Sequence, residues 1–193
     1  MILNLLYKLY VKLKYGQFKK VGINISISYP TKIDNPFNIS ISDNVTVHHE
    51  SWIAARPFPG KSSELIIGNN VVIGNFNHIY ATHRIVIEDY VLTADKVYIS
   101  DNLHCYQDPD LPILLQPIKQ LKDVVIGEGS WLGENVCVIG ANIGKHCVIG
   151  ANAVVTKDIP DYSVAVGVPA RIVKRYDFKK KEWRKTDSMG FFL

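Results

Sequence analysis

The sequence predicts an all-β protein, a single-stranded parallel β-helix, on two observations. Residues 126–160 repeat about every six residues, and each unit opens on an aliphatic side chain. Gly or Asn recurs near the middle of the units, and both residues accept the left-handed backbone angles that tight corners need. A period of six fits neither a helix nor a simple strand. It is typical of short strands that meet at corners and stack coil upon coil.

The same period occurs upstream. Openers six residues apart form three sets: Ile41, Val47 and Ile53; Ile67, Ile73 and Ile79; Ile87, Thr93 and Ile99. Three units make one triangular coil, so the span from residue 41 to residue 160 predicts about five coils spaced about 4.8 Å apart. We expect the openers to point inward and form the core of the resulting prism.

The repeat has two main interruptions. Residues 59–64 are a short polar insert. Residues 103–123 are rich in Asp, Pro and Leu and contain no repeat. Long loops inside a regular scaffold are usually functional or disordered. We therefore expect a protruding loop at about 103–123 that shapes a binding site.

The two ends are basic and the middle is mildly acidic. Residues 1–22 mix lysines with Leu, Tyr and Val, which predicts an amphipathic helix. Such a helix either caps the open end of the prism or attaches peripherally to an anionic membrane surface, and both roles can hold together. Residues 171–193 are expected to form a short basic tail. The β-helix domain is then 23–170.

Composition excludes several classes of protein. The 193 residues suit one domain, and no apolar run is long enough to span a bilayer. The start lacks the cleavage site of a signal peptide, and the three cysteines lack metal spacing. We expect reduced, structural cysteines in a cytoplasmic protein. Charge confined to the ends argues against a nucleic-acid partner.

Two segments near the C-terminus carry a family resemblance. Residues 154–160, Val-Val-Thr-Lys-Asp-Ile-Pro, and residues 167–171, Gly-Val-Pro-Ala-Arg, follow the hexads in order. This combination resembles the hexapeptide-repeat acyltransferases, above all the sugar O-acetyltransferases of the galactoside, maltose and exopolysaccharide type. The resemblance implies a left-handed β-helix, a homotrimer and acetyl-CoA as co-substrate, with no metal. It also implies acetyl transfer to a sugar hydroxyl of a glycan or glycan precursor, of the capsule, exopolysaccharide or lipopolysaccharide type.

The family's catalytic histidine lies at the end of the last hexad before the protruding loop. Counting the hexads in phase places His104 there, followed by Cys-Tyr-Gln-Asp-Pro as in exopolysaccharide transferases. Many relatives have a second histidine two residues earlier, where this chain has Asn102. Transfer to a hydroxyl needs a base, and free imidazole titrates near pH 6.5. The resemblance thus implies that His104 is the general base.

The remaining site residues are also implied by the resemblance. The positions that match coenzyme A contacts are Trp131, Ala151, Thr156, Lys157, Arg171 and Lys174. Asn75 matches an acceptor-binding asparagine. The acid expected about eight residues later is absent, and His83 and Arg84 stand there instead. The missing acid favours a different, negatively charged acceptor, such as an acidic sugar; alternatively, His83 and Arg84 are simply surface residues.

Three other interpretations stay open at the sequence level. The nearest is N-acetylation of an amino sugar, which attacks the same thioester. The second is a zinc protein like the gamma-type carbonic anhydrases, because His78 and His83 have the spacing of two of their ligands and His48 or His49 lies upstream. The third is a non-catalytic trimeric scaffold, which predicts no acetyl-CoA turnover.

Overall fold

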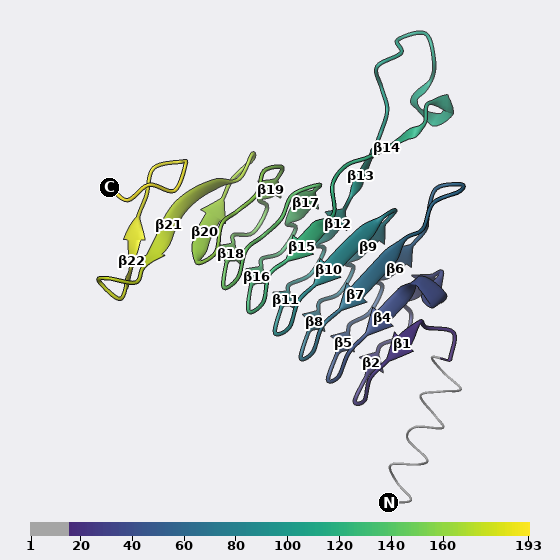
Figure 1. Ribbon diagram of the computed structural model, residues 1–193, viewed down its shortest axis with the longest axis horizontal. Coiled ribbons are helices and arrows are strands. Elements are labelled where there is room, and N and C mark those ends of the chain that lie inside the picture. Colours follow the sequence, from purple (N-terminus) through teal and green to yellow (C-terminus); the bar gives the residue numbers. More distant parts are fainter. Residues whose placement is uncertain (1–15) are drawn as a thin grey trace, which may run out of the picture.

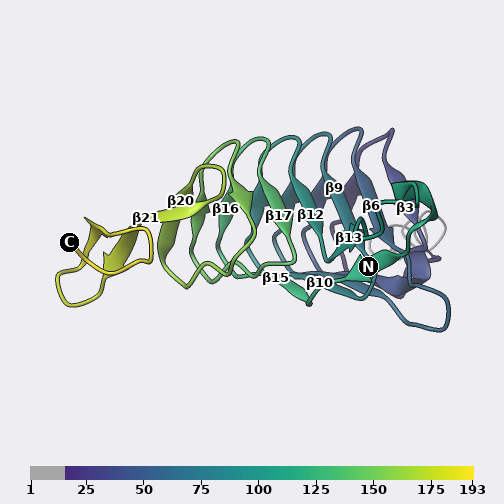
Figure 2. The ribbon, with the colours of Figure 1, turned by 90° about the horizontal axis from the view of Figure 1, so that it is seen from above.

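The computed structural model describes residues 16–193, and its strands form three parallel sheets that wrap into a triangular prism (Figures 1 and 2). This arrangement is typical of a left-handed β-helix. Sheet A contains β1 (Lys20–Val21), β4 (Ile39–Ile41), β7 (Glu64–Ile67), β10 (Arg84–Ile87) and β15 (Val124–Ile126). Sheet C contains β3 (Lys32–Asp34), β6 (Trp52–Ala55), β9 (His78–Ala81), β12 (Tyr98–Ser100), β17 (Cys137–Ile139) and β19 (Val154–Val155).

Sheet B is the longest of the three and includes the C-terminal strands. Its parallel part contains β2 (Ser26–Ile27), β5 (Thr46–Val47), β8 (Val72–Ile73), β11 (Leu92–Thr93), β16 (Trp131–Leu132), β18 (Val148–Ile149) and β20 (Ser163–Val166). The antiparallel strands β21 (Arg171–Asp177) and β22 (Glu182–Lys185) extend it. Residues 171–193, expected as a tail, therefore begin with a hairpin that continues the sheet, because the backbone of β21 pairs with β20.

Every predicted opener lies in the core. The upstream sets and the openers of residues 126–155 are all at most 1% exposed, including the threonine at position 93. The hydroxyl of Thr93 accepts a hydrogen bond from the backbone N–H of Gly74, which satisfies this buried polar group. The prediction of about five coils is confirmed for residues 39–155. One further coil, built from β1, β2 and β3, precedes them.

Asparagine builds many of the corners. Asn24, Asn44, Asn70, Asn135 and Asn152 all have positive φ, between 57° and 61°. Their side chains also bond between coils: Nδ2 of Asn24 donates to Oδ1 of Asn44, whose Nδ2 donates to Oδ1 of Asn70. The corner residues therefore contribute hydrogen bonds as well as backbone freedom.

The expected helix over residues 1–22 is not formed in its last part. Residues 1–15 lie outside the described residues. Residues 16–22 form a turn and strand β1, whose Lys20 and Val21 pair with Ser40 and Ile41 of β4. The first coil thus begins by residue 20, because these backbone groups find partners in the next coil rather than in a helix. Between residues 16 and 193, no helix has the length and apolar character needed to cross a bilayer.

The three cysteines are free. Burial raises the pKa of the Cys147 thiol to about 11, so this side chain stays protonated and packs as a small core residue.

Candidate active site

A two-stranded hairpin carries the candidate base away from the prism (Figure 1). Strand β13 (Asn102–His104) pairs antiparallel with β14 (Ile118–Gln120), and His104 lies opposite Ile118. The hairpin leaves the prism where sheet C turns into sheet A, an edge that we call the C/A edge. The side chain of His104 is exposed, so an acceptor can reach it.

The tip of the hairpin is held by one buried amide. Nε2 of Gln116 donates to the carbonyl oxygens of Asp108 and Leu111, both at 2.8 Å, and Oε1 accepts from the backbone N–H of Asp108 at 3.3 Å. Apolar side chains around it are exposed, and Leu114 is 88% exposed. The loop is therefore internally ordered but presents apolar surface outward.

A buried carboxylate fixes the root of the hairpin. Oδ1 of Asp101 accepts from the backbone N–H of Thr82 at 2.8 Å and from its hydroxyl at 2.7 Å. Oδ2 accepts from the backbone N–H of His83 at 2.7 Å and of Arg84 at 2.9 Å. Asp101 therefore binds the turn between β9 and β10 to the residue directly before β13.

Burial acts to raise the pKa of Asp101, but the hydrogen bonds outweigh it. The N–H groups of His83 and Thr82, the Thr82 hydroxyl and the Asn102 amide leave the pKa below its ordinary value. The group is therefore an ionised, structural anion at neutral pH, beside the strand that bears His104.

The two candidate acceptor-binding residues His83 and Arg84 lie at the C/A edge. Nδ1 of His83 is 2.6 Å from Oδ1 of Asp123, and Nε of Arg84 is 3.5 Å from Oε2 of Glu64. The side chains of His83 and Arg84 are 52% and 39% exposed. Both are accessible, and the turn that carries them is the one bound by Asp101.

Asn75 lies elsewhere, at the edge between sheets B and C. Its Oδ1 accepts from the backbone N–H of His49 at 3.1 Å, and its Nδ2 donates to Oδ1 of Asp95 at 3.1 Å. Asn69 makes the same set of bonds at another corner, with Asp89 as its acceptor. The contacts of Asn75 are thus those of a corner residue, and within one chain it is not near His83 or Arg84.

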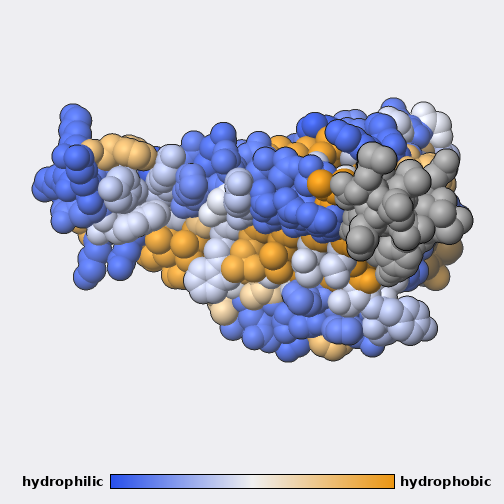
Figure 3. All heavy atoms as spheres, turned by 90° about the horizontal axis from the view of Figure 1, so that it is seen from below, coloured by the Kyte–Doolittle hydropathy of each residue, from blue (hydrophilic) through white to orange (hydrophobic). Residues whose placement is uncertain are grey.

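Trp131 and Lys174 share the outward row of sheet B. The register runs from Trp131 through Val148 and Val164 to Lys174, three strand spacings or about 14 Å. Trp131 is 47% exposed and pairs with Leu92, which is 45% exposed. Figure 3 shows an apolar strip running along the prism between hydrophilic margins. Trp131 and Leu92 therefore contribute exposed apolar surface to sheet B.

Two other candidate residues line one pocket at the C-terminal end. Lys157 and Arg171 border a cavity of about 430 Å³ together with Asp158. Among residues 16–193, no carboxylate lies within 4.0 Å of either cation, because Asp158 pairs with Lys122. Two unneutralised cations in one cavity suit a phosphate group.

The last two candidate contacts are exposed at corners. Ala151 lies at the edge between sheets B and C. Gly133 of the preceding coil approaches it closely: a Cβ atom on Gly133 would lie 2.7 Å from the backbone nitrogen of Ala151. Thr156 follows β19 directly and precedes Lys157.

The candidate residues therefore fall on two sides of the prism. His104, His83 and Lys157 lie along or beside the C/A edge. Trp131 lies on sheet B, the face opposite that edge in a three-sided prism. One chain cannot bring these groups together, so a site that uses all of them needs a second copy of the chain.

The histidines of the zinc interpretation do not converge. Within residues 16–193, no group of three or more His, Cys, Asp or Glu side chains is arranged to hold a metal. His78 stacks on Trp52 with ring centroids 4.4 Å apart, on the outer face of sheet C. Burial, helped by the charge of Lys32, lowers the pKa of His78. His83 instead faces Asp123, at the corner beyond β9.

Sequence comparison decides the family. Residues 123–157 match a family model described as the hexapeptide repeat of succinyl-transferase. The chain is 35% identical over 166 residues to WbbJ of Escherichia coli strain K12, which is named as a lipopolysaccharide biosynthesis O-acetyltransferase. That match covers 82% of this chain and 83% of WbbJ. The chain belongs to the hexapeptide-repeat acetyltransferase family. It is an acetyltransferase.

Other members and neighbours of the acetyltransferase agree with this assignment. Galactoside O-acetyltransferase of Escherichia coli strain K12 is 28% identical over 81% of this chain and 76% of its own length. A maltose O-acetyltransferase structure from Clostridium difficile 630 is 26% identical with a TM-score of 0.53, covering 89% of this chain and 76% of that one.

A solved structure with higher structural similarity confirms the fold. AntD, an N-acyltransferase from Bacillus cereus solved with dTDP and 3-hydroxybutyryl-CoA, superposes with a TM-score of 0.73 over 89% of this acetyltransferase and 90% of AntD. The sequence identity is 22%, so this likeness establishes the shared architecture alone.

Sequence reasoning did not identify Asp101 as part of the site. A repeat in the hexads could have done so, because Asp89, Asp95 and Asp101 occupy the same hexad position six residues apart. The first two accept hydrogen bonds from the corner asparagines 69 and 75, and the third accepts them from the turn at 82–84.

Proposed function

We propose that this enzyme transfers acetyl from acetyl-CoA to a sugar hydroxyl of a glycan or glycan precursor, such as a lipopolysaccharide, capsule or exopolysaccharide unit. The observation that carries the proposal is the exposed His104 on a hairpin whose root is fixed by the buried Asp101. The names of WbbJ and of galactoside O-acetyltransferase support a sugar hydroxyl as acceptor.

In the proposed reaction, a neutral imidazole nitrogen of His104 takes the proton of the acceptor hydroxyl. The oxygen attacks the thioester carbonyl carbon directly, and a tetrahedral oxyanion forms. This intermediate collapses as the carbon–sulfur bond breaks, and the sulfur takes the proton from the imidazolium. The products are the acetyl ester and free coenzyme A. General base catalysis of this kind typically contributes about 10²–10⁴-fold.

The donor is proposed to lie between two copies of the chain. Lys157 and Arg171 bind phosphate groups of coenzyme A in their shared cavity. Trp131 and Lys174 of the facing copy supply the apolar groove and a further cation, with Ala151 and Thr156 alongside. This division follows from the placement of the candidate residues on opposite sides of one prism. A homotrimer, with one site at each of three interfaces, uses every candidate residue.

The acceptor is proposed to meet His83 and Arg84 beside the base. Both residues sit on the turn held by Asp101, and the fixed charge of Arg84 favours an acceptor with negative charge. Asn75 contributes from a neighbouring copy if it contributes at all, since in its own chain it lies at a different edge. The loop at 103–123 then covers the acceptor and shapes its selection.

The proposed place of action is the cytoplasm, where acetyl-CoA is available. The basic segment at residues 1–15 is proposed to bring the enzyme to the inner face of the membrane when the acceptor is lipid-linked.

The test is release of free thiol from acetyl-CoA across a panel of sugars, acidic sugars, amino sugars and glycan precursors. Acceptor-dependent release by the wild type should fall by about 10²–10⁴-fold in His104→Ala. Lys61→Ala, in the exposed insert at residues 59–64, should keep wild-type turnover. Release that survives His104→Ala removes this histidine as the base. Turnover with amines alone selects N-acetylation, and a complete lack of turnover favours the scaffold.

A further inference from the structure

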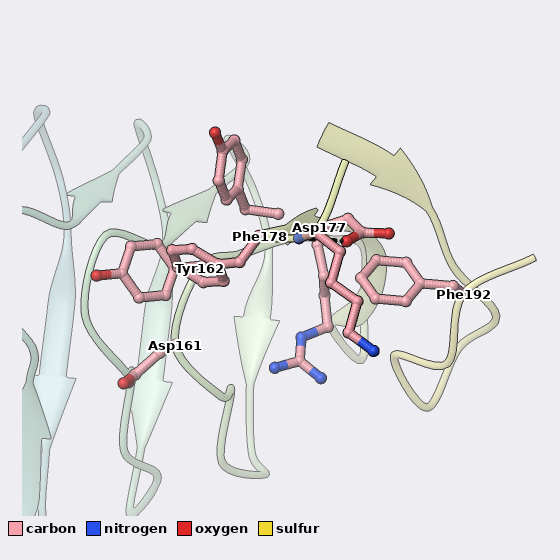
Figure 4. Close-up of a pocket in the computed structure, with 8 residues that line it drawn as sticks. Asp161, Tyr162, Asp177, Phe178 and Phe192 are labelled. Carbon is pink, nitrogen blue, oxygen red and sulfur yellow. Dashed lines mark hydrogen bonds between the residues drawn. The ribbon is translucent and has the colours of Figure 1, made fainter. Parts of the chain in front are cut away.

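The C-terminal hairpin encloses a cavity that the acetyl-transfer proposal does not use. It has a volume of about 600 Å³ and lies between the last coil and the strands that follow it. Asp161 and Tyr162 line it from the coil, and Phe192 lines it from the C-terminal segment (Figure 4). Cavities of this size are typical of small-ligand sites.

One wall of the cavity is aromatic and angled. The rings of Tyr162 and Phe178 meet edge to face, with centroids 4.8 Å apart and planes at 87°. Tyr176 packs against Phe178 in the same way, at 5.0 Å and 80°. His146 stacks behind Tyr162 at 5.2 Å and braces it. Phe178 remains 62% exposed, so single ring faces stay open to a ligand.

Two cations, Arg175 and Lys179, also line the cavity. Nε of Arg175 is buried and has no hydrogen-bond partner among the residues described. In the same part of the chain, no ion pair within 4.0 Å holds Arg175 or Lys179. The nearby carboxylate of Asp177 is occupied by Arg184 and by the N–H groups of Lys179 and Lys180. With Asp177 occupied, the charges of Arg175 and Lys179 are left to attract an anion in the cavity.

The lining also contains a hydrogen-bond acceptor, the carboxylate of Asp161. Oδ1 of Asp161 accepts from the backbone N–H of Lys145 at 2.8 Å, and no hydrogen bond to its Oδ2 occurs within residues 16–193. The cavity thus offers aromatic faces, a guanidinium, an ammonium and one carboxylate oxygen.

We propose that this cavity is a second binding site, for a sugar ring that carries an anionic group. The apolar C–H face of the ring lies on Tyr162 or Phe178, the anion meets Arg175 and Lys179, and a hydroxyl donates to Asp161. Arginine binds carboxylate or phosphate through two parallel N–H bonds.

The geometry favours a sugar over a free nucleotide. A nucleobase is held best between parallel ring faces, whereas these rings are nearly perpendicular. A nucleotide diphosphate would also face the carboxylate of Asp161, which a sugar hydroxyl can instead satisfy. The site shares no residue with the proposed acetyl-transfer site; that its sugar is a unit of the glycan rests on the proposed function.

The experiment is isothermal titration calorimetry without acetyl-CoA, so that it is independent of the proposed activity. The probes are a hexasaccharide containing glucuronic acid, its carboxyl-reduced neutral counterpart, glucose 1-phosphate and ADP. We expect the acidic hexasaccharide to bind at least about tenfold more tightly than the neutral one. Glucose 1-phosphate distinguishes phosphate from carboxylate as the anion.

Arg175→Gln and Phe178→Ala should each weaken binding by about tenfold or more. Phe191→Ala and Lys180→Gln remove an equally exposed ring and a neighbouring cation that do not line the cavity, and they should leave binding unchanged. Thermal unfolding checks each variant, and Lys179→Gln replaces Arg175→Gln if the latter does not fold. Equal binding of the neutral probe, no binding of any sugar, or tighter binding of ADP would overturn the proposal.

Discussion

The backbone N–H of His83 donates a 2.7 Å hydrogen bond to Oδ2 of Asp101. This bond links the turn that carries His83 and Arg84 to the residue from which the His104 hairpin starts. The position of the proposed base relative to these two candidate acceptor-binding residues therefore depends on one buried carboxylate. A group that acts in this way positions the site without touching the substrate.

Asp101→Asn should destabilise the enzyme by about 2–4 kcal/mol, because the amide places a donor where three N–H groups and a hydroxyl converge. Urea unfolding at pH 7 measures the loss. Asp110→Asn, in the exposed part of the loop, is the matched control and should cost less than about 0.5 kcal/mol. An Asp101→Asn protein as stable as the wild type would mean that the carboxylate does not hold the root.

The same carboxylate predicts a pH dependence. Its pKa is lowered in the folded protein, so its contribution to stability is complete above the ordinary Asp value of about 3.9. That contribution disappears as the pH falls through the lowered folded value. The stability gap between wild type and Asp101→Asn should thus be constant from pH 7 to pH 5 and shrink below about pH 4. Urea midpoints of both proteins between pH 7 and pH 3 test this, and a gap that widens in acid contradicts it.

Much of the fold follows from periodicity, since the hexads place every sixth side chain at the same inward position. Ile67, Ile73 and Ile79 are buried where the spacing puts them. The C-terminal hairpin escaped this reasoning because antiparallel strands have a period of two, and lysines 179–181 at its turn resemble a solvated tail. The His104 hairpin was located, but its anchor was not: the hexad position shared by Asp89, Asp95 and Asp101 marks a corner aspartate, and only the structure shows that Asp101 binds the turn at 82–84.

Asn75 matches the family's acceptor-binding asparagine in sequence, but its contacts in the structure are those of a corner residue. Asn75→Ala and Asn69→Ala should each lower stability by about 1 kcal/mol, since each removes a side-chain amide that donates to a corner aspartate, Asp95 or Asp89, and accepts from a backbone N–H. Urea unfolding compares them directly. If only Asn69→Ala destabilises, the corner interpretation of Asn75 is wrong. The acceptor KM of the same two proteins then tests the role implied by the family, which requires an increase in Asn75→Ala alone.

The proposed phosphate-binding cavity beside Lys157 and Arg171 predicts a donor-specific defect. Lys157→Ala should raise the KM for acetyl-CoA about tenfold and leave kcat within about twofold, because a phosphate contact far from the thioester contributes equally before and during transfer. Steady-state kinetics with saturating acceptor measures both values. Lys61→Ala, in the insert loop, should change neither. A fall in kcat with an unchanged KM would move Lys157 from donor binding to the chemical step.

The last prediction concerns the loop that follows His104, the proposed base. Gln116→Ala removes both bonds to the carbonyl oxygens of Asp108 and Leu111, so the tip should loosen while the prism stays intact. We expect the stability of the fold to change by less than about 1 kcal/mol, because the loop lies outside the core. The acceptor kcat/KM should fall about tenfold, with the KM for acetyl-CoA unchanged.

Amide hydrogen exchange over residues 105–117, measured beside the kinetics, separates loosening from misfolding. Gln107→Ala is the matched control, since its amide lies in the same loop but contacts only the N–H of the adjacent Tyr106. If exchange accelerates in Gln116→Ala and acceptor kinetics stay normal, the loop does not select the acceptor. Selection must then come from the fixed turn at 82–84, and Asp101 becomes the residue that sets the geometry on which acceptor choice depends.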